Sequence, residues 1–134
     1  MSTRELTEET FDAAVTDNEI VLVDWWAEWC GPCKQFGPIF EEASTRHADV
    51  VFGKVDTEAQ RSLAAGAQIT SIPTIMAFRD GILVFAQPGA LPAPALESLL
   101  TQVKELDMDD VRAKVAEHEH AEAASETDGD RSTA

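Results

Sequence analysis

The sequence has 134 residues, a mass of 14.6 kDa and 44% hydrophobic residues, which is enough to build one globular domain with a substantial core. Its formal net charge of −15 argues against binding to nucleic acids or anionic membranes, because both require a basic surface. No apolar run approaches the roughly eighteen residues of a membrane span, and residues 1–20 lack the apolar core of a secretory signal. A cytoplasmic protein is therefore expected.

The first half of the chain alternates between predicted helices and strands. Thr7 is expected to cap a first helix, with acidic residues following in its first turn. Residues 20–26 (IVLVDWW) are apolar on both faces, which is typical of a central strand in a parallel sheet. From Cys33 the apolar spacing becomes helical, and residues 50–55 (VVFGKV) form a second buried strand.

The second half adds a short helix, a hairpin and a closing helix. Thr57 and Gln60 have the spacing of a capping box for the short helix. Residues 74–78 and 82–86 are predicted strands, joined by a tight turn that contains Asp-Gly. The closing helix is defined by apolar residues at helical spacing, namely Leu96, Leu99, Leu100, Val103 and Leu106.

The resulting order of elements, α-β-α-β-α-β-β-α, contains a βαβ unit followed by a hairpin and a helix. It predicts an α/β fold, in which a central mixed β-sheet is flanked by helices on both faces. We assign residues 1–106 to this domain and residues 107–134 to an acidic C-terminal extension. The extension is rich in Ala, Glu, Ser and Asp, so we expect a helix to about residue 115 and disorder beyond it.

Both cysteines lie in the stretch WCGPCK, as Cys30 and Cys33. Their spacing fits half of a zinc site, an inert buried pair or a reversible disulfide. Zinc needs four ligands, but the chain has no third cysteine, and only His47 lies outside the extension, so no metal is expected. Gly31 and Pro32 favour a strand-to-helix junction, because proline suits the first turn of a helix. We therefore prefer the reversible disulfide.

A cysteine at the start of a helix is expected to be reactive. The free backbone amides and the helix dipole favour the thiolate form of Cys30. Cys33 lies one turn further along, on a side expected to be more buried. We therefore expect Cys30 to be exposed and to attack a disulfide of another protein, here called the client, and Cys33 to resolve the mixed disulfide.

Asp24 stands among apolar residues of a predicted strand, six positions before Cys30. A buried carboxylate is costly, so burial should raise the pKa of Asp24 toward neutrality, which suits a proton-transfer group. The alternative is an acid at the end of a strand that reaches water.

Across residues 7–106 the sequence resembles the thioredoxin family. The resemblance is carried by VDWWAEWCGPCK together with KVD and SIPT further along the chain. It implies a thioredoxin fold and a cytosolic protein-disulfide reductase, which carries electrons by dithiol–disulfide exchange through Cys30 and Cys33. No bound cofactor is implied. The implied partner is thioredoxin reductase, a flavoprotein that uses NADPH to recharge the disulfide.

The resemblance also implies how the proton is handled. Asp24 corresponds to the buried acid that helps to deprotonate Cys33, and Lys54 to the lysine that pairs with this acid. By residue type alone, Lys54 would be a surface residue. Trp25 replaces the phenylalanine usual after the acid, and we expect its larger ring to affect the packing around Asp24.

The resemblance further implies a groove for client proteins. Trp29 corresponds to a residue on its rim, while Trp26 packs beneath the active site. Ile72–Pro73 corresponds to a cis peptide bond, which exposes the backbone of Ile72 so that an extended client segment can pair with it. Gly89 corresponds to a glycine that keeps the groove open, although a plain turn is an alternative for this residue.

The spacer Gly31–Pro32 bears on the direction of the reaction. It lacks the histidine that oxidising members of the family tend to have, which implies a reductant. Two other functions stay open at this point: a thiol oxidase or isomerase outside the cytosol, and a binding module whose fold and acidic extension recruit a partner. We expect a monomer that acts on disulfide-containing client proteins.

Overall fold

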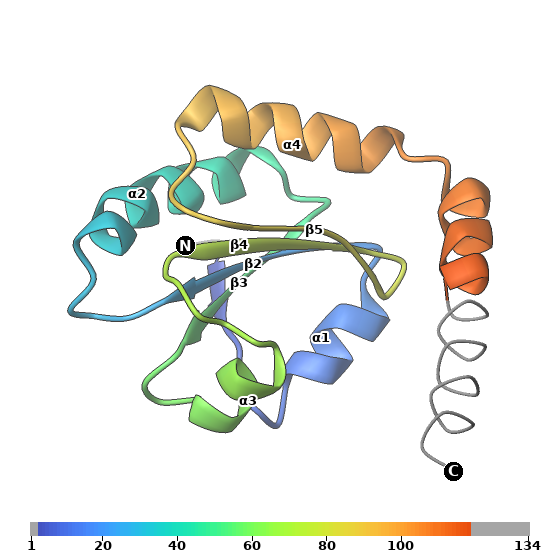
Figure 1. Ribbon diagram of the computed structural model, residues 1–134. Coiled ribbons are helices and arrows are strands. Elements are labelled where there is room, and N and C mark those ends of the chain that lie inside the picture. Colours follow the sequence, from blue (N-terminus) through green and yellow to red (C-terminus); the bar gives the residue numbers. More distant parts are fainter. Residues whose placement is uncertain (1–2, 119–134) are drawn as a thin grey trace, which may run out of the picture. The chain divides into compact units, whose positions relative to one another are not determined.

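In the computed structural model the elements follow in the order β1 (Thr3–Glu5), α1 (Phe11–Asp17), β2 (Ile20–Trp26), α2 (Gly31–Arg46), β3 (Val51–Asp56), α3 (Arg61–Gly66), β4 (Thr74–Arg79), β5 (Ile82–Pro88) and α4 (Ala93–Glu105) (Figure 1). The structure describes residues 3–118.

The strands form one mixed sheet in the order β1-β3-β2-β4-β5. β2 lies at its centre, parallel to β3 on one edge and antiparallel to β4 on the other. Helices α2 and α4 lie on one side of the sheet, and α1 and α3 on the other (Figure 1). This is the α/β fold that the sequence predicts.

β2 supplies both layers of the core, because its side chains alternate between the two faces. Leu22 packs in the cluster shared with α2 and α4, whereas Val21 and Val23 pack in the cluster under α1 and α3. All three side chains are fully buried. Burial of each contributes roughly 1.5–3 kcal/mol, which explains why this run of residues occupies the centre of the sheet.

The sequence did not predict β1, and the predicted cap of the first helix is wrong. β1 has three residues, too few for a periodic pattern, and it is held by parallel pairing with β3. α1 begins at Phe11, after a turn in which the Thr7 carbonyl accepts hydrogen bonds from the amides of Thr10 and Phe11. Thr7 therefore closes the preceding turn.

The predicted capping box of α3 is also wrong, because both of its side chains are used elsewhere. The Thr57 hydroxyl donates to the carbonyl oxygen of Trp26, 3.1 Å away. The Gln60 side chain accepts a hydrogen bond from the Glu8 amide at 3.0 Å. These contacts fasten α3 to β2 and to the loop before α1.

The predicted hairpin is confirmed. β4 and β5 pair antiparallel around Asp80 and Gly81, which have φ angles of 53° and 79°. Two successive residues with positive φ are typical of the hairpin turn whose twist matches its strands, and Asp-Gly favours it. Both strands run one or two residues further than predicted, which brings the end of β5 beside the start of β4.

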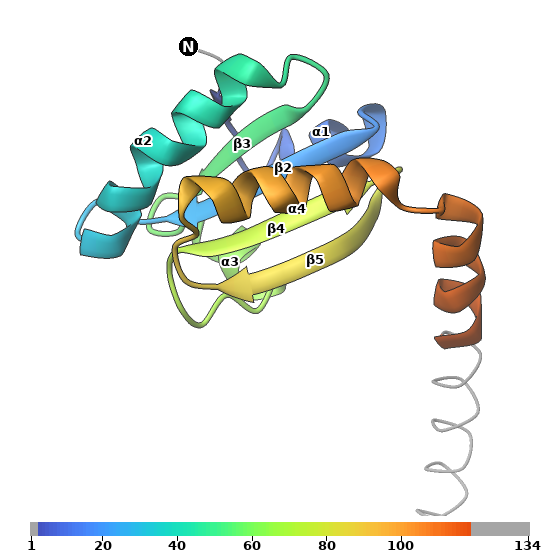
Figure 2. The same cartoon turned by 90° about the horizontal axis from the view of Figure 1, so that it is seen from above.

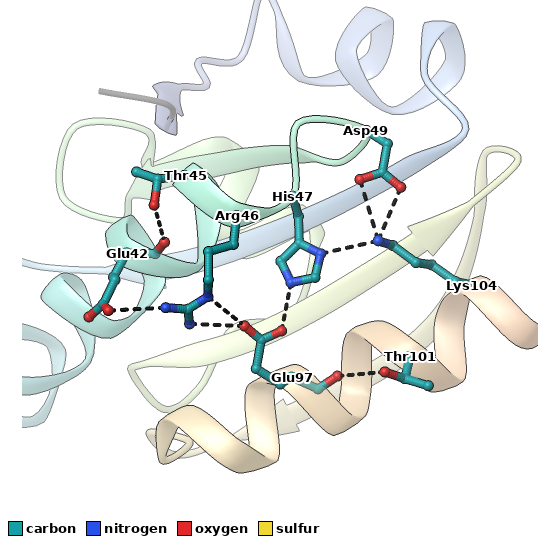
Figure 3. A network of polar contacts seen from close by, with 8 residues as sticks. All are labelled: Glu42, Thr45, Arg46, His47, Asp49, Glu97, Thr101 and Lys104. Carbon is teal, nitrogen blue, oxygen red and sulfur yellow. Dashed lines mark hydrogen bonds and ion pairs between the residues drawn. The ribbon is translucent and has the colours of Figure 1, made fainter.

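A polar network joins the C-terminal end of α2 to α4 (Figure 3). Glu97 accepts hydrogen bonds from Arg46 at 2.9 Å and from His47 at 2.6 Å. The Lys104 ammonium group lies 3.1 Å from the other ring nitrogen of His47. Because an ammonium group only donates, this nitrogen accepts, and the ring donates to Glu97. The network holds α2 at the end opposite to the cysteines.

The chain divides into two compact units, Met1–Lys104 and Glu105–Ala134. In the second unit residues 108–118 are helical, and residues 106–107 separate them from α4. The assignment of residues 107–134 as an extension stays a prediction. The disorder predicted after about residue 115 falls mostly on residues 119–134, which lie outside the described residues. Between residues 3 and 118, no helix combines the length and apolar character required to cross a membrane.

Gly53 gives a test of how tightly β3 packs. A Cβ atom there would collide with Cδ1 of the buried Leu6 and lie 2.9 Å from its Cγ. We predict that Gly53→Ala lowers the free energy of unfolding by roughly 1–3 kcal/mol, measured by urea denaturation. The matched control is Gly37→Ala in α2, where a Cβ atom meets nothing within 4 Å. It should raise stability by about 0.5–1 kcal/mol, and equal effects of the two changes would contradict this packing.

Candidate thiol–disulfide site

Cys30 and Cys33 form a disulfide at the junction between β2 and α2. Cys30 is the N-cap of α2, and its sulfur accepts a hydrogen bond from the Cys33 amide at 3.2 Å. Gly31 and Pro32 form the first positions of the helix, where the missing N–H group of proline leaves no helical hydrogen bond unmade. The Cys30 sulfur therefore lies where free amides and the helix dipole stabilise a negative charge.

The two cysteines do not differ in exposure as predicted. In the disulfide form Cys30 is 3% exposed and Cys33 4% exposed, because both belong to a buried cluster against which Trp26 and Ile72 pack. They differ instead in their surroundings. The Cys30 sulfur lies 3.7 Å from the carbonyl oxygen of Ile72, whereas Cys33 lines a pocket that also contains Asp24.

Asp24 is the buried acid of the site. It is 1% exposed, and within residues 3–118 its Oδ1 atom has no hydrogen-bond partner. Burial raises the pKa of Asp24 to about 7, although the charge of Lys54 lowers it in part. The direction agrees with the sequence prediction, and the alternative of an acid that reaches water is wrong.

Lys54 stands next to Asp24 in the parallel pairing of β2 and β3. Their side chains therefore share the face of the sheet that α2 covers. Within the described part of the chain, no hydrogen bond or ion pair joins the two groups. The Lys54 ammonium group instead lies 5.0 Å from the centre of the Trp26 ring. Lys54 thus acts on Asp24 as a nearby charge.

Asp24, Cys33, Lys54 and Trp26 line a pocket of about 160 Å³, together with Glu28, Lys34 and Gly37. This volume has room for several water molecules. Since Asp24 and Cys33 both line the pocket, water in it offers a route for a proton between them once the disulfide is reduced.

The three tryptophans occupy different environments. Trp29 is 68% exposed, and its indole N–H donates to Glu58 Oε1 at 3.2 Å. Trp26 is half-buried beside the disulfide. Trp25 is fully buried on the opposite face of the sheet from Asp24, where its ring packs 5.6 Å from that of Phe11. The expectation that Trp25 affects the packing around Asp24 is therefore wrong, because the backbone of β2 separates them.

The peptide bond Ile72–Pro73 is cis, as the resemblance implied. The start of β4 pairs with the end of β2, with Thr74 opposite Trp25, and this places the bond beside the disulfide. The Gly89 amide donates to the Pro73 carbonyl at 2.8 Å. With a φ of 106°, Gly89 adopts a conformation that side chains strongly disfavour, and a Cβ atom there would meet open space. Gly89 thus forms a turn tied to the Pro73 loop.

No group of three or more Asp, Glu, His or Cys residues among those described could hold a metal ion. The remaining features are a disulfide at a helix start, a buried acid behind it and a cis-proline beside it. They define the class of thiol–disulfide oxidoreductases built on a mixed α/β sheet.

Comparison with known proteins agrees with this class. The family model for thioredoxin matches residues 2–102. Putative thioredoxin 2 of Streptomyces coelicolor is 61% identical over 118 residues, which cover 88% of each chain. Thioredoxin 1 of Synechococcus elongatus is 41% identical, with 71% of this chain and 91% of that protein covered. The solved thioredoxin structure from Plasmodium falciparum has a TM-score of 0.70 and 37% identity, and covers 75% of this chain and 98% of that one.

The chain belongs to the thioredoxin family. With its Cys30–Cys33 disulfide it is a protein-disulfide oxidoreductase that works by dithiol–disulfide exchange. Thioredoxins carry no cofactor, so the redox-active group is the disulfide itself.

The pKa of Asp24 predicts how stability changes with pH. It lies at about 7 in the folded protein, whereas the ordinary pKa of an aspartate is 3.8, so the folded state binds more protons between these pH values. The contribution of Asp24 to the free energy of unfolding should therefore be largest below about pH 4, fall as the pH rises to about 7, and then level off. Asp24→Asn should remove ~3 kcal/mol of the fall between about pH 5 and about pH 8, measured by urea denaturation of the oxidised protein.

The control for this measurement is Glu28→Gln, which changes an exposed acid that lines the same pocket. It should keep the full decline of stability with pH. An identical decline in Asp24→Asn and the wild type would show that Asp24 is not the group responsible.

Lys54 gives a second prediction on the same pocket. Because its charge lowers the pKa of Asp24, Lys54→Met should raise that pKa further, above about 7. The decline of stability should then extend to higher pH than in the wild type, in the same denaturation series. Lys34→Met removes another cation that lines the pocket and serves as the control. Equal shifts in both variants would argue against a specific influence of Lys54.

Proposed function

We propose that this protein is a cytoplasmic protein-disulfide reductase and electron carrier, in which Cys30 attacks client disulfides and Cys33 resolves the mixed disulfide. The observation that carries the proposal is the position of the Cys30 sulfur at the N-cap of α2, where it accepts a hydrogen bond from the Cys33 amide. In the reduced protein the same amide and the helix dipole would stabilise a thiolate on Cys30. Cys33 lies inside the first turn, beside the pocket of Asp24.

The proposed reaction consists of two successive thiol–disulfide exchanges. The Cys30 thiolate attacks one sulfur of the client disulfide, a new S–S bond forms, and the other client sulfur leaves as a thiolate. Cys33 then gives up its proton and attacks the Cys30 sulfur, which releases the second client thiolate and forms the Cys30–Cys33 disulfide. Two electrons pass from the protein's dithiol to the client.

Asp24 is proposed to accept the proton of Cys33. A carboxyl group with a pKa of about 7 exists in both forms near neutral pH, so it can take up a proton and release it again. The shared pocket supports a transfer through water, and the charge of Lys54 keeps the pKa of Asp24 from rising further.

Client segments are proposed to bind next to the disulfide, along the backbone of Ile72. Its carbonyl group lies beside the Cys30 sulfur, and Pro73 follows it in the cis form. Trp29, exposed and hydrogen-bonded to Glu58, supports a role as the rim of this site. The open turn at Gly89 supports access from the other side.

The proposed cycle is closed by a flavoprotein thioredoxin reductase, which would return electrons from NADPH to the disulfide. The Gly31–Pro32 spacer supports a reducing direction, because it provides no cation that would stabilise the reduced thiolate and make the disulfide strongly oxidising. The cytoplasm is the proposed compartment, since its thiol pool is kept reduced.

The roles of the two cysteines are tested by trapping. Cys33→Ser should accumulate a mixed disulfide between Cys30 and client proteins, because the resolving thiol is missing. Cys30→Ser should accumulate none. The adducts can be separated by gel electrophoresis without reductant and identified by peptide mass. Equal trapping by both variants would overturn the assignment.

A further inference from the structure

Charged residues are distributed unevenly around the disulfide. The chain is 26% charged, yet residues 62–78 and 81–96 contain no Asp, Glu, Lys, Arg or His. The first of these segments runs through the cis-proline loop into β4, and the second covers β5 and the Gly89 turn. On the other side of the disulfide lie Glu28 and Lys34, which line the pocket of Asp24. The disulfide therefore has one charged and one uncharged flank.

The uncharged flank contains a groove of about 310 Å³. Its lining includes Ser71, Thr74, Met76, Leu83, Ala86 and Pro88, and we call it the β5 groove. Met76 belongs to the core cluster under α1 and α3, so the groove lies on that face of the sheet. Among the described residues, this cluster includes no side chain from β5. β5 is also an edge strand, visible at the margin of the sheet in Figure 2.

Leu83 is the apolar end of the β5 groove. It is 48% exposed, and Trp29 is the other large hydrophobic residue exposed within residues 3–118. Isolated exposed leucines need no explanation, but this one lines a groove that leads to the active site.

The β5 groove is continuous with the disulfide site. Ser71 and Thr74 line it and directly flank Ile72–Pro73, and Pro88 pairs with Thr74 at the same end. From Pro88 to Leu83 the strand advances five residues, which corresponds to about 17 Å. An extended segment that starts at the disulfide therefore reaches Leu83 about five residues along its own chain.

We propose that the β5 groove binds the client segment on one side of its reactive cysteine, and that it selects uncharged segments with an apolar side chain about five residues from that cysteine. This inference rests on the proposed function and specifies its substrate class. Continuity with the disulfide favours a client over other occupants, because a segment held at Cys30 has a path into the groove. The uncharged lining offers no partner to a buried charge, so charged segments would lose hydration without compensation.

The test uses three disulfide-linked peptides as probes. Each has a central cysteine, with leucine, serine or glutamate placed about five residues before and after it. Reduced wild-type protein should react with the leucine peptide roughly five- to tenfold faster than with the serine peptide, since part of a leucine side chain becomes buried. The glutamate peptide should be slowest. Hydroxyethyl disulfide, which is too small to reach Leu83, measures the exchange chemistry itself.

Leu83→Ser should bring the ratio of leucine-peptide to serine-peptide rates close to one. Leu83→Met, the conservative control, should keep the wild-type ratio. Leu83→Lys should instead favour the glutamate peptide, which a general loss of structure would not produce. This reversal of preference is the readout that assigns the contact to Leu83.

Unchanged peptide ratios in Leu83→Ser and Leu83→Lys would overturn the inference while leaving the proposed function intact. So would a concentration-dependent dimer that Leu83→Ser abolishes without changing the peptide ratios, because the groove would then serve a second copy of the chain. Failure of the wild type to reduce hydroxyethyl disulfide and all three peptides would overturn the proposed function and this inference together.

Discussion

The pairing of β2 on both of its edges is the constraint on which the site depends. Parallel pairing with β3 places Lys54 beside Asp24, and antiparallel pairing with β4 places Thr74 beside Trp25. The first pairing sets the charge next to the acid, and the second brings Ile72–Pro73 to the disulfide. Because β2 packs into both layers of the core, a slip by one residue would exchange the side chains of the two layers and move Asp24 away from Lys54.

The same constraint explains why an acid can stay buried here. Asp24 lies on a strand whose hydrophobic neighbours on both faces stabilise the fold, so the cost of one unpaired carboxyl group is tolerated. That cost has a chemical use, because it raises the pKa of Asp24 into the range where a proton is readily exchanged. The pocket connects this acid to Cys33, and the helix start presents Cys30 to the other side. Burying Asp24 therefore lowers the stability of the fold at neutral pH, but it supplies the site with a group that readily exchanges a proton.

The sequence predicted those parts of the fold that rest on local chemistry. The run IVLVDWW predicted β2, Gly31–Pro32 the start of α2, and Asp24 among apolar residues the buried acid. It did not predict the features that depend on contacts between distant segments. β1 is held by its pairing with β3, and the side chains of Thr57 and Gln60 form hydrogen bonds with other segments instead of capping α3. The cluster that buries both cysteines is packed against Ile72, far along the chain. The separation of Trp25 from Asp24 could have been predicted from the sequence, since adjacent residues of a strand face opposite sides of the sheet.

The central claim is that β2 holds Asp24 as a buried carboxyl group, without a protein hydrogen-bond partner at Oδ1 among the described residues, behind the disulfide. It is tested most directly by titrating the oxidised protein with ¹³C labels on the aspartate carboxyl carbons and following the Asp24 resonance by NMR. The resonance is assigned by its loss in Asp24→Asn. The structure predicts a midpoint near the value of about 7 that burial produces. A midpoint near about 4, as for an aspartate in water, would contradict the account.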